Sequence, residues 1–375
     1  MESNEKIQIE RQEYREKKQR QRLEFYAKQN LPYEVKVRRA AERVHEFVRE
    51  MDKRGCNCHV SVGGLDSITL LMFIRSLGYK DIPAISVSNV EDKSIQIIHK
   101  QLGVEVVKSY KTKVQVLNEV GFPVISKRIA GKIDTLQHPT EKNKTVRHAI
   151  ITGECGAQGH YATNSKMKLP KKWLKLFGGY ENENEGVNYQ IPDFMVSNRC
   201  CYYIKEKPCD DWAKEHNSHA FLGMMASEGG QREDAIIEHG CNYYGKGVMR
   251  SAPFGPFYRQ DLLQLALDLN VPMPEIYGEI ARKPDGTLYT TKAQRTGCGM
   301  CGFGIHMEKR PHRFDLLRER NEKEWHFWMY ECCTDPKTGE KFGWGRVLDY
   351  IGVEWEDRYI DWGARQMNIF EMLGE

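Results

Sequence analysis

The pattern of apolar and polar positions changes its period along the chain. From about residue 57, short apolar runs typical of buried strands alternate with stretches that have helical spacing. Strands are predicted at 58–62, 82–88, 104–110, 219–227 and 247–255, and helices at 67–78, 92–103 and 259–270. Such alternation with tight connections is typical of a parallel sheet covered by helices. We therefore expect an α/β fold in which a twisted parallel sheet carries helices on both faces.

The flanking segments have a different character. Residues 1–52 are rich in Lys, Arg and Glu, and 35–51 has an amphipathic helical pattern. We interpret this part as a charged helical extension that packs one face on the body. The alternative is a basic arm for nucleic acid, or helices that bind a partner protein or a second copy of the chain. Residues 130–195 are polar, and we interpret them as an insertion or mobile segment over the ligand edge of the sheet.

Composition narrows the class of protein. The chain has 375 residues, of which 40% are hydrophobic and 29% charged, and no run approaches the roughly 20 apolar residues of a membrane helix. The N-terminal segment has no apolar signal region, so we expect a cytoplasmic location and no membrane partner. A net charge of +4 is too small to indicate nucleic-acid binding by itself. Eleven cysteines, an odd number, argue against a disulfide framework and favour metal binding or redox chemistry.

The stretch HVSVGGLDSITLLMFI, residues 59–74, places two glycines between a strand and a helix. Gly63 and Gly64 let the backbone close around an oxyanion such as phosphate, and a side chain at Gly64 is expected to fill the space of that anion. Asp66 and Ser67 open the following helix. Ser67 can donate its hydroxyl to a phosphate, whereas Asp66 acts through a metal ion or caps the helix. A plain strand–helix turn is the alternative.

Four cysteines form a second chemical signal. Cys200 and Cys201 are adjacent, and Cys298 and Cys301 form a Cys-x-x-Cys between glycines. Four thiolates brought together by the fold suit a soft metal. Adjacent cysteines bind one compact ion awkwardly, which favours a 4Fe–4S cluster over zinc. Buried thiols without a metal are the remaining interpretation.

In their order along the chain, these segments resemble the phosphoadenosine phosphosulfate (PAPS/APS) reductase-like family of the adenine nucleotide alpha-hydrolase superfamily. SVGGLDS resembles its pyrophosphate loop, SGGxDS, with Val62 in place of the usual Ser and Leu65 at a position that is often Lys. The Cys-Cys and Cys-x-x-Cys pair is similar to the iron–sulfur ligands of assimilatory APS reductases and of the DNA phosphorothioation ATP pyrophosphatase. The resemblance covers roughly residues 57–330 and implies an alpha-hydrolase-like nucleotide-binding domain at 53–290, followed by a Cys-rich helical region at 291–375.

Two further segments extend the resemblance. FLGMMASEGGQRED is similar to an element of the family whose basic residues handle the anionic end of the nucleotide. Met225 stands where its first arginine is usual, which leaves Arg232 as the best anion-binding candidate. GFPVISKRIA resembles the substrate loop of the family, and it makes Lys127 and Arg128 candidate contacts.

The resemblance leaves the reaction open between two branches and a non-catalytic nucleotide-binding module. In the ATP-cleaving branch, ATP is split between its α and β phosphates, Mg²⁺ offsets the charge on pyrophosphate, and sulfur from a donor replaces an adenylated oxygen of the acceptor. Nucleic acid, either tRNA or DNA, is the acceptor that we favour. The reductase branch needs a mobile C-terminal cysteine, yet the tail QMNIFEMLGE has none, and the nearest late cysteines are Cys332 and Cys333. We therefore favour the ATP-cleaving branch. Leu65 and Met225, which stand where a Lys and an Arg are usual, weaken the resemblance to both branches.

Overall fold

The computed structural model describes residues 2–154, 166–178, 181–182, 187–188 and 192–356. It divides into two compact units, each built from two stretches of chain. The first unit comprises 1–111 and 201–299, and the second 112–200 and 300–375. Residues 112–200, which were expected within a nucleotide-binding domain at 53–290, instead fold together with the C-terminal region. The domain boundaries expected from the sequence are therefore replaced by two discontinuous units, which are described in turn.

The first unit contains a six-stranded sheet in the order β3-β2-β1-β7-β9-β8. Its strands are β1 (Asn57–Ser61), β2 (Ala84–Ser86), β3 (Glu105–Val106), β7 (Ser218–Leu222), β8 (Asn242–Tyr244) and β9 (Met249–Ser251). All neighbours are parallel except β8 and β9, which confirms the expected α/β class with a mainly parallel sheet. The chain adds β2 and β3 on one side of β1, and β7 and β9 on the other. The gap between β1 and β7 is therefore a topological switch point, where open α/β sheets bind ligands.

Helices cover both faces of this sheet, as the sequence predicted. The helices of the unit are α1 (Glu2–Gln29), α2 (Tyr33–Lys53), α3 (Leu65–Ser76), α4 (Lys93–Gln101), α9 (Lys207–Glu215), α10 (Gly230–His239) and α11 (Arg259–Asp268). His59 of β1 packs its ring 5.3 Å from that of Trp212 in α9. Phe221, paired with Val60 in the sheet, packs 5.0 Å from Phe47 of α2. Since successive residues of a strand face opposite sides, α9 and α2 cover opposite faces.

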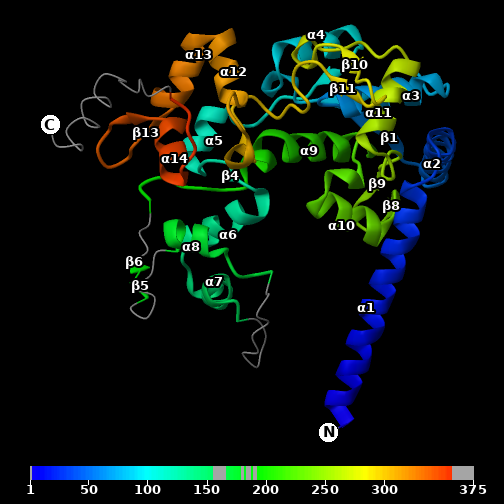
Figure 1. Cartoon of the computed structure of the whole chain (residues 1–375). Helices are drawn as coiled ribbons and strands as arrows, with labels where there is room; N and C mark the ends of the chain where they lie inside the picture. The colour runs from blue at the N-terminus through cyan, green and yellow to red at the C-terminus, as the bar shows by residue number, and fades with distance from the viewer. Residues whose placement is uncertain (1, 155–165, 179–180, 183–186, 189–191, 357–375) are drawn as a thin grey trace. The chain divides into compact units, whose positions relative to one another are not determined.

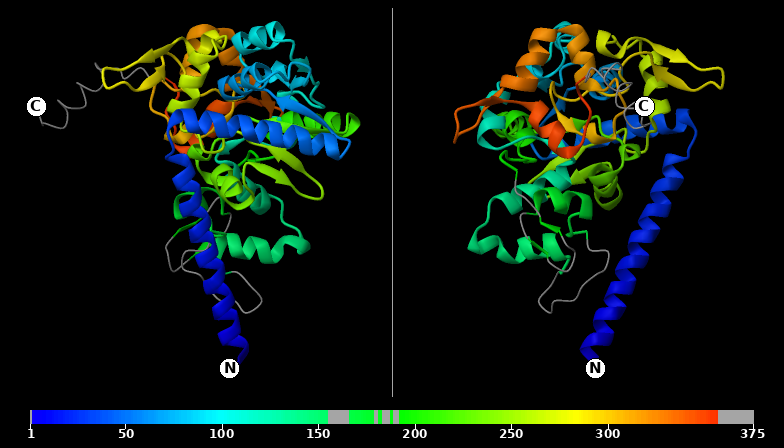
Figure 2. Two further views of the ribbon diagram at one scale, coloured as in Figure 1. Left: turned by 90° about the vertical axis from the view of Figure 1, so that its right-hand side faces the viewer. Right: turned by 60° about the vertical axis from the view of Figure 1, so that its left-hand side comes forward.

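The N-terminal extension is helical, as expected, and it packs one face on the sheet unit. Helix α2 buries Ala40, Val44, Phe47 and Met51 at helical spacing in the core. Helix α1 is a single long helix that ends beside α2 (Figures 1 and 2). Its contacts with α10 are both apolar and polar: Phe25 packs in a small cluster with Ile236, the Tyr26 hydroxyl donates to Glu233 over 2.9 Å, and the Arg22 guanidinium lies 3.6 Å from Asp234.

The second unit is mainly helical and has an aromatic core. Its helices are α5 (Lys113–Glu119), α6 (Lys127–Gln137), α7 (Lys144–Thr152), α8 (Lys171–Phe177), α12 (Arg313–Arg320), α13 (Glu322–His326) and α14 (Trp344–Ile351). Its short strands are β4 (Val124–Ile125), β5 (Glu181–Asn182), β6 (Val187–Asn188), β12 (Gly302–Phe303), β13 (Cys333–Thr334) and β14 (Lys341–Phe342). The ring of Trp344 lies 5.0 Å from that of Phe122 and 5.3 Å from that of Phe314. These contacts between distant segments explain why 112–200 belong with the C-terminal region.

The described part of 130–195 is therefore largely helical and packed, and not an irregular loop. Most of the stretch FGGYENENEGVNYQ lies outside the described residues. No helix in the described ranges combines the length and the apolar character needed to cross a membrane.

Candidate functional site

A cavity of about 360 Å³ opens at the carboxyl ends of β1 and β7, at the switch point of the sheet. All of its lining residues come from the first unit. They are Gly63, Gly64, Leu65, Asp66, Ser67, Glu91, Lys205, Leu222, Gly223, Met224, Glu228, Arg232, Arg259, Tyr277, Gln294, Arg295, Thr296 and Gly297. The position and the mixed polar lining are those of a ligand site in an open α/β sheet.

The loop between β1 and α3 is a tight turn that closes on itself. The Gly63 N–H donates to the Ser67 hydroxyl oxygen over 2.7 Å, and that hydroxyl donates to the Gly64 carbonyl over 3.0 Å. Gly223, which follows β7, lets the start of α3 approach this strand, because a Cβ there would lie 2.9 Å from the Ser67 Cα and N atoms. The turn therefore depends on a glycine from a distant segment as well as on its own pair.

The two loop glycines have different surroundings. A Cβ at Gly63 would meet no atom closer than the Glu91 Oε1, 3.5 Å away. A Cβ at Gly64 would lie 2.3 Å from the Tyr277 hydroxyl oxygen and 3.1 Å from the Thr296 Oγ1. The expectation that a Gly64 side chain would fill the space of an anion is therefore corrected, since that side chain would collide first with Tyr277. Gly63 is the glycine that keeps the cavity open.

Buried side chains hold the loop from behind. The Tyr277 hydroxyl accepts the Leu65 N–H over 3.1 Å and pairs with the Thr296 hydroxyl over 2.5 Å. His99 of α4 places its Nε2 2.8 Å from the Gly63 carbonyl oxygen, which can only accept. Its Nδ1 lies 2.7 Å from the Ser88 hydroxyl, which then donates to it. Burial lowers the pKa of His99, which favours this neutral form.

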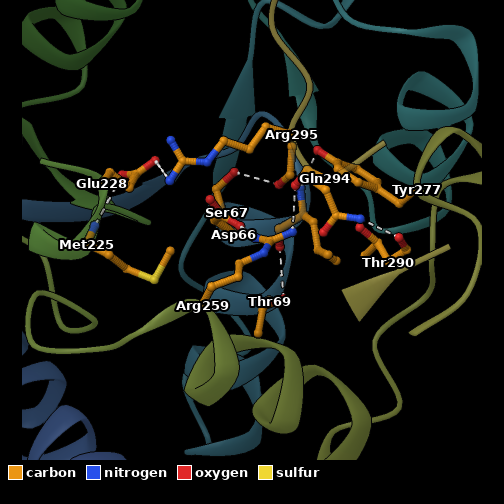
Figure 3. A network of polar contacts seen from close by, with 12 residues as sticks. Asp66, Ser67, Thr69, Met225, Glu228, Arg259, Tyr277, Thr290, Gln294 and Arg295 are labelled. Atoms are coloured by element: carbon orange, nitrogen blue, oxygen red, sulfur yellow. Dashed lines mark hydrogen bonds and ion pairs between the residues drawn. The ribbon is translucent and has the colours of Figure 1, made fainter. Parts of the chain in front are cut away.

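Charged side chains of both signs converge on the cavity, and each basic group is paired with an acidic one. Asp66 pairs with Arg259, and Glu228 pairs with Arg295 (Figure 3). Glu91 pairs with Lys205, and Glu228 also pairs with Arg232. The Arg295–Glu228 distance is 3.5 Å, and only 6% of the Glu228 side chain is exposed. The lining therefore carries four basic and three acidic side chains, a formal charge of +1.

Asp66 has a perturbed acidity. Burial raises its pKa, and the neighbouring Arg259 opposes this effect without cancelling it, so that the pKa lies above the ordinary value of an aspartate. Perturbed carboxyl groups in a cleft are typical of functional sites, although structural ion pairs produce them as well.

The structure brings together five of the residues selected from the sequence: Gly63, Gly64, Asp66, Ser67 and Arg232 all line the cavity. Lys127 begins α6 in the second unit, whereas every lining residue belongs to the first. Sequence reasoning missed Lys205, Tyr277, Arg259 and Arg295. The position of Arg259 offered a signal, because it begins the helix after β9, where residues of an α/β sheet reach the ligand edge.

The four predicted metal ligands divide equally between the units. Cys201 and Cys298 belong to the first, and Cys200 and Cys301 to the second, so neither unit alone supplies four thiolates. Within the described ranges, no three Cys, His, Asp or Glu side chains are grouped so that they could hold a metal ion. Burial lowers the pKa of Lys205, but the Cys298 thiol and Glu91 carboxylate beside it outweigh burial and raise it overall. The 4Fe–4S cluster, like the rival zinc ion, stays a prediction.

Cys332 and Cys333 are packed inside the second unit, with exposed fractions of 2% and 1%. The Cys332 thiol donates to the Trp328 carbonyl over 3.3 Å. The hydrogen bond with Cys332, together with burial, raises the pKa of Cys333 far above that of an ordinary thiol. Neither group has the exposure of a mobile nucleophile, and the raised pKa of Cys333 also keeps that thiol protonated.

Comparisons with protein-family models, with curated proteins and with solved structures found no match for this chain.

Proposed function

We propose that the first unit binds ATP with Mg²⁺ in the cavity between β1 and β7. We further propose that it cleaves ATP between the α and β phosphates, as a step in transferring sulfur to an acceptor. The observation that carries this proposal is the cavity itself: a glycine loop, the start of α3 and four basic side chains converge at the switch point of a parallel sheet. Such an arrangement suits the phosphates of a nucleotide.

Binding would exchange internal partners for ligand atoms. The Gly63 N–H and the Ser67 hydroxyl currently bond within the loop. A phosphate oxygen that accepts both hydrogen bonds takes over these partners at little net cost, because the number of hydrogen bonds is kept. Arg259 can reach the same oxygen from the start of α11, since it already pairs with Asp66 in the loop.

The acidic residues of the cavity suit the metal that accompanies a triphosphate. Mg²⁺ is commonly bound through one or two carboxylates together with phosphate oxygens. Asp66, Glu91 and Glu228 supply carboxylates in the lining. When bound, Mg²⁺ supplies charge stabilisation for the departing pyrophosphate. In this proposal, Asp66 and Ser67 are the residues nearest the chemistry, Asp66 through the metal and Ser67 through a phosphate oxygen.

The choice of adenine and of sulfur transfer is supported by the sequence resemblance alone. The packed state of Cys332 and Cys333 adds a reason to favour ATP cleavage over sulfonucleotide reduction. The predicted cluster takes no part in the steps described above.

Titration calorimetry with ATP and Mg²⁺ tests the site. Arg259→Gln removes one charge-assisted contact and should weaken binding roughly 10- to 100-fold. The matched control is Arg282→Gln, because Arg282 belongs to the same unit and bonds to the Gly286 carbonyl and to Gln264, but is not part of the lining. Equal binding by both variants would refute the site.

The reaction is tested by measuring AMP and pyrophosphate in the presence of candidate acceptors. Their release supports ATP cleavage. ATP binding without turnover with any acceptor would instead support a non-catalytic nucleotide-binding module. Sulfite formation from PAPS or APS that is lost in Cys332→Ser or Cys333→Ser would move the protein to the reductases.

A further inference from the structure

The positive charge of the chain is concentrated in one short region of the second unit. Residues 126–178 contain eleven lysines and arginines against three aspartates and glutamates, a formal charge of +8, whereas the whole chain carries +4. The rest of the chain is therefore net negative. We call the described residues 126–154 and 166–178, which contain α6, α7 and α8, the basic module.

The basic module is a packed structure with its charges outside. Helix α6 packs against both α7 and α8 (Figure 1). The apolar side chains of the module join the aromatic core of the unit; they include Ala130, Ile133, Ile150, Leu169, Trp173 and Phe177. Eight of its lysines are exposed, and they include six on and around α7 and α8: Lys142, Lys144, Lys166, Lys168, Lys172 and Lys175.

The acidic groups of the module do not neutralise these lysines. Asp134 lies 3.0 Å from His138, and Glu154 pairs with His148. Among the described residues, none of the six lysines forms an ion pair. Lys132, which is half-buried, donates to the Lys166 and Lys168 carbonyls over 2.6 and 3.2 Å and so fixes the segment that carries two of them.

Four neutral polar side chains of the module bond to its own backbone. The Thr135 and Thr152 hydroxyls donate to the Gly131 and His148 carbonyls over 2.9 and 2.8 Å. Thr140 and Asn143 cap each other, with N–H to oxygen distances of 2.9 and 3.2 Å. These groups are therefore not available to read base edges or ribose hydroxyls.

The described part of the module exposes no Trp, Tyr or Phe ring, since Trp173 and Phe177 are both buried. Single-stranded nucleic acid is usually held on exposed aromatic rings. What the module presents is a set of lysine point charges, which suit phosphates. Duplex DNA offers a dense and regular array of these, with one charge per about 1.7 Å of helix axis.

We propose that the basic module binds the phosphate backbone of double-stranded DNA without reading its sequence. The binding itself does not depend on the nucleotide site. The proposal deepens the proposed function by naming duplex DNA as the class of acceptor. Only this identification of the acceptor rests on the proposed ATP-dependent sulfur transfer.

Fluorescence anisotropy of the full-length protein with a duplex of about 20 base pairs, measured between about 50 and about 200 mM KCl, tests the proposal. Contact with about four to six phosphates gives a slope of log affinity against log salt of about −4 to −5. Lys144→Gln combined with Lys172→Gln should reduce the magnitude of this slope by about two and weaken binding at least tenfold. The matched control is Lys80→Gln with Lys246→Gln, two exposed lysines of the first unit.

A duplex preference over single strands of the same length, together with an effect confined to the module variant, supports the proposal. Equal losses in both variants, equal affinity for polyglutamate, or binding of duplex RNA in preference to DNA would overturn it. ATP binding by the module variant is measured separately. If that variant binds ATP normally but has lost DNA binding, the loss does not come from damage to the ATP site. The two measurements therefore distinguish failure of this proposal from failure of the proposed function.

Discussion

Gly64 is predicted to be a packing residue, and Gly64→Ala tests this directly. The new Cβ would lie 2.3 Å from the Tyr277 hydroxyl oxygen, about 1 Å closer than such atoms normally approach. Tyr277 is only 3% exposed and its hydroxyl pairs with Thr296, so the ring has little freedom to move aside. Overpacking of this kind costs roughly 1–3 kcal/mol of folding free energy.

Removing the hydroxyl should relieve the collision. Tyr277→Phe leaves the nearest atoms to the Gly64 Cβ at 3.1 Å (Thr296 Oγ1) and 3.6 Å (the ring carbon Cζ of Tyr277). Alone, this change deprives the Leu65 N–H of its acceptor and costs roughly 1–3 kcal/mol. In the double variant the losses should therefore not add: the combined loss should fall short of the sum by about 1 kcal/mol or more.

Native-state hydrogen exchange of the α3 amides measures these losses in the first unit alone. Gly63→Ala is the matched control, since its Cβ meets nothing closer than 3.5 Å and its stability should stay within about 0.5 kcal/mol of the parent. Additive losses in the double variant, or a Gly64→Ala protein as stable as the control, would show that Tyr277 does not fix this glycine.

Two further predictions concern other parts of the chain. Burial lowers the pKa of His59 to about 4. The unfolded chain therefore takes up a proton at this residue near pH 6.5, whereas the folded chain takes it up only near pH 4. The free energy of unfolding should fall by roughly 3 kcal/mol as the pH drops from about 6.5 to about 4, and urea titrations of His59→Asn should show a flatter pH profile. Anaerobically purified protein should contain about four iron and four sulfide per chain, lost in Cys298→Ser but kept in Cys155→Ser. A colourless protein with stoichiometric zinc would contradict the cluster.

The sequence predicted the sheet unit well where the signals are local. The strand of β1, the glycine turn and helix α3 lie within about twenty consecutive residues, and their periodicity and turn residues specify them without help from the rest of the chain. The two-unit division could not be predicted in this way. It depends on contacts such as Phe122 with Trp344 and on strand pairs of two residues, which are too short to show a period.

The same distinction applies to the candidate site. Gly63, Asp66 and Ser67 were predicted because they are neighbours in one motif. Tyr277 and Arg295 reach the cavity through the folding of the chain after α11, where no local pattern marks them. The strand–glycine–helix pattern also assigned both glycines to the ligand, whereas the structure gives Gly64 a role in packing against Tyr277.

The pairing of charges in the cavity bears on which ligand can bind there. Each basic side chain already has a carboxylate partner, so a lone anion such as sulfate would have to separate an ion pair and leave a carboxylate such as Glu91, whose side chain is 4% exposed, without its cation. Leaving a buried charge unpaired costs several kcal/mol, which offsets what the anion gains. A ligand that brings phosphates and a divalent cation together can satisfy the arginines and the carboxylates at once. The arrangement therefore favours a metal–nucleotide complex over a free anion, which is the class of ligand that the proposed ATP cleavage requires.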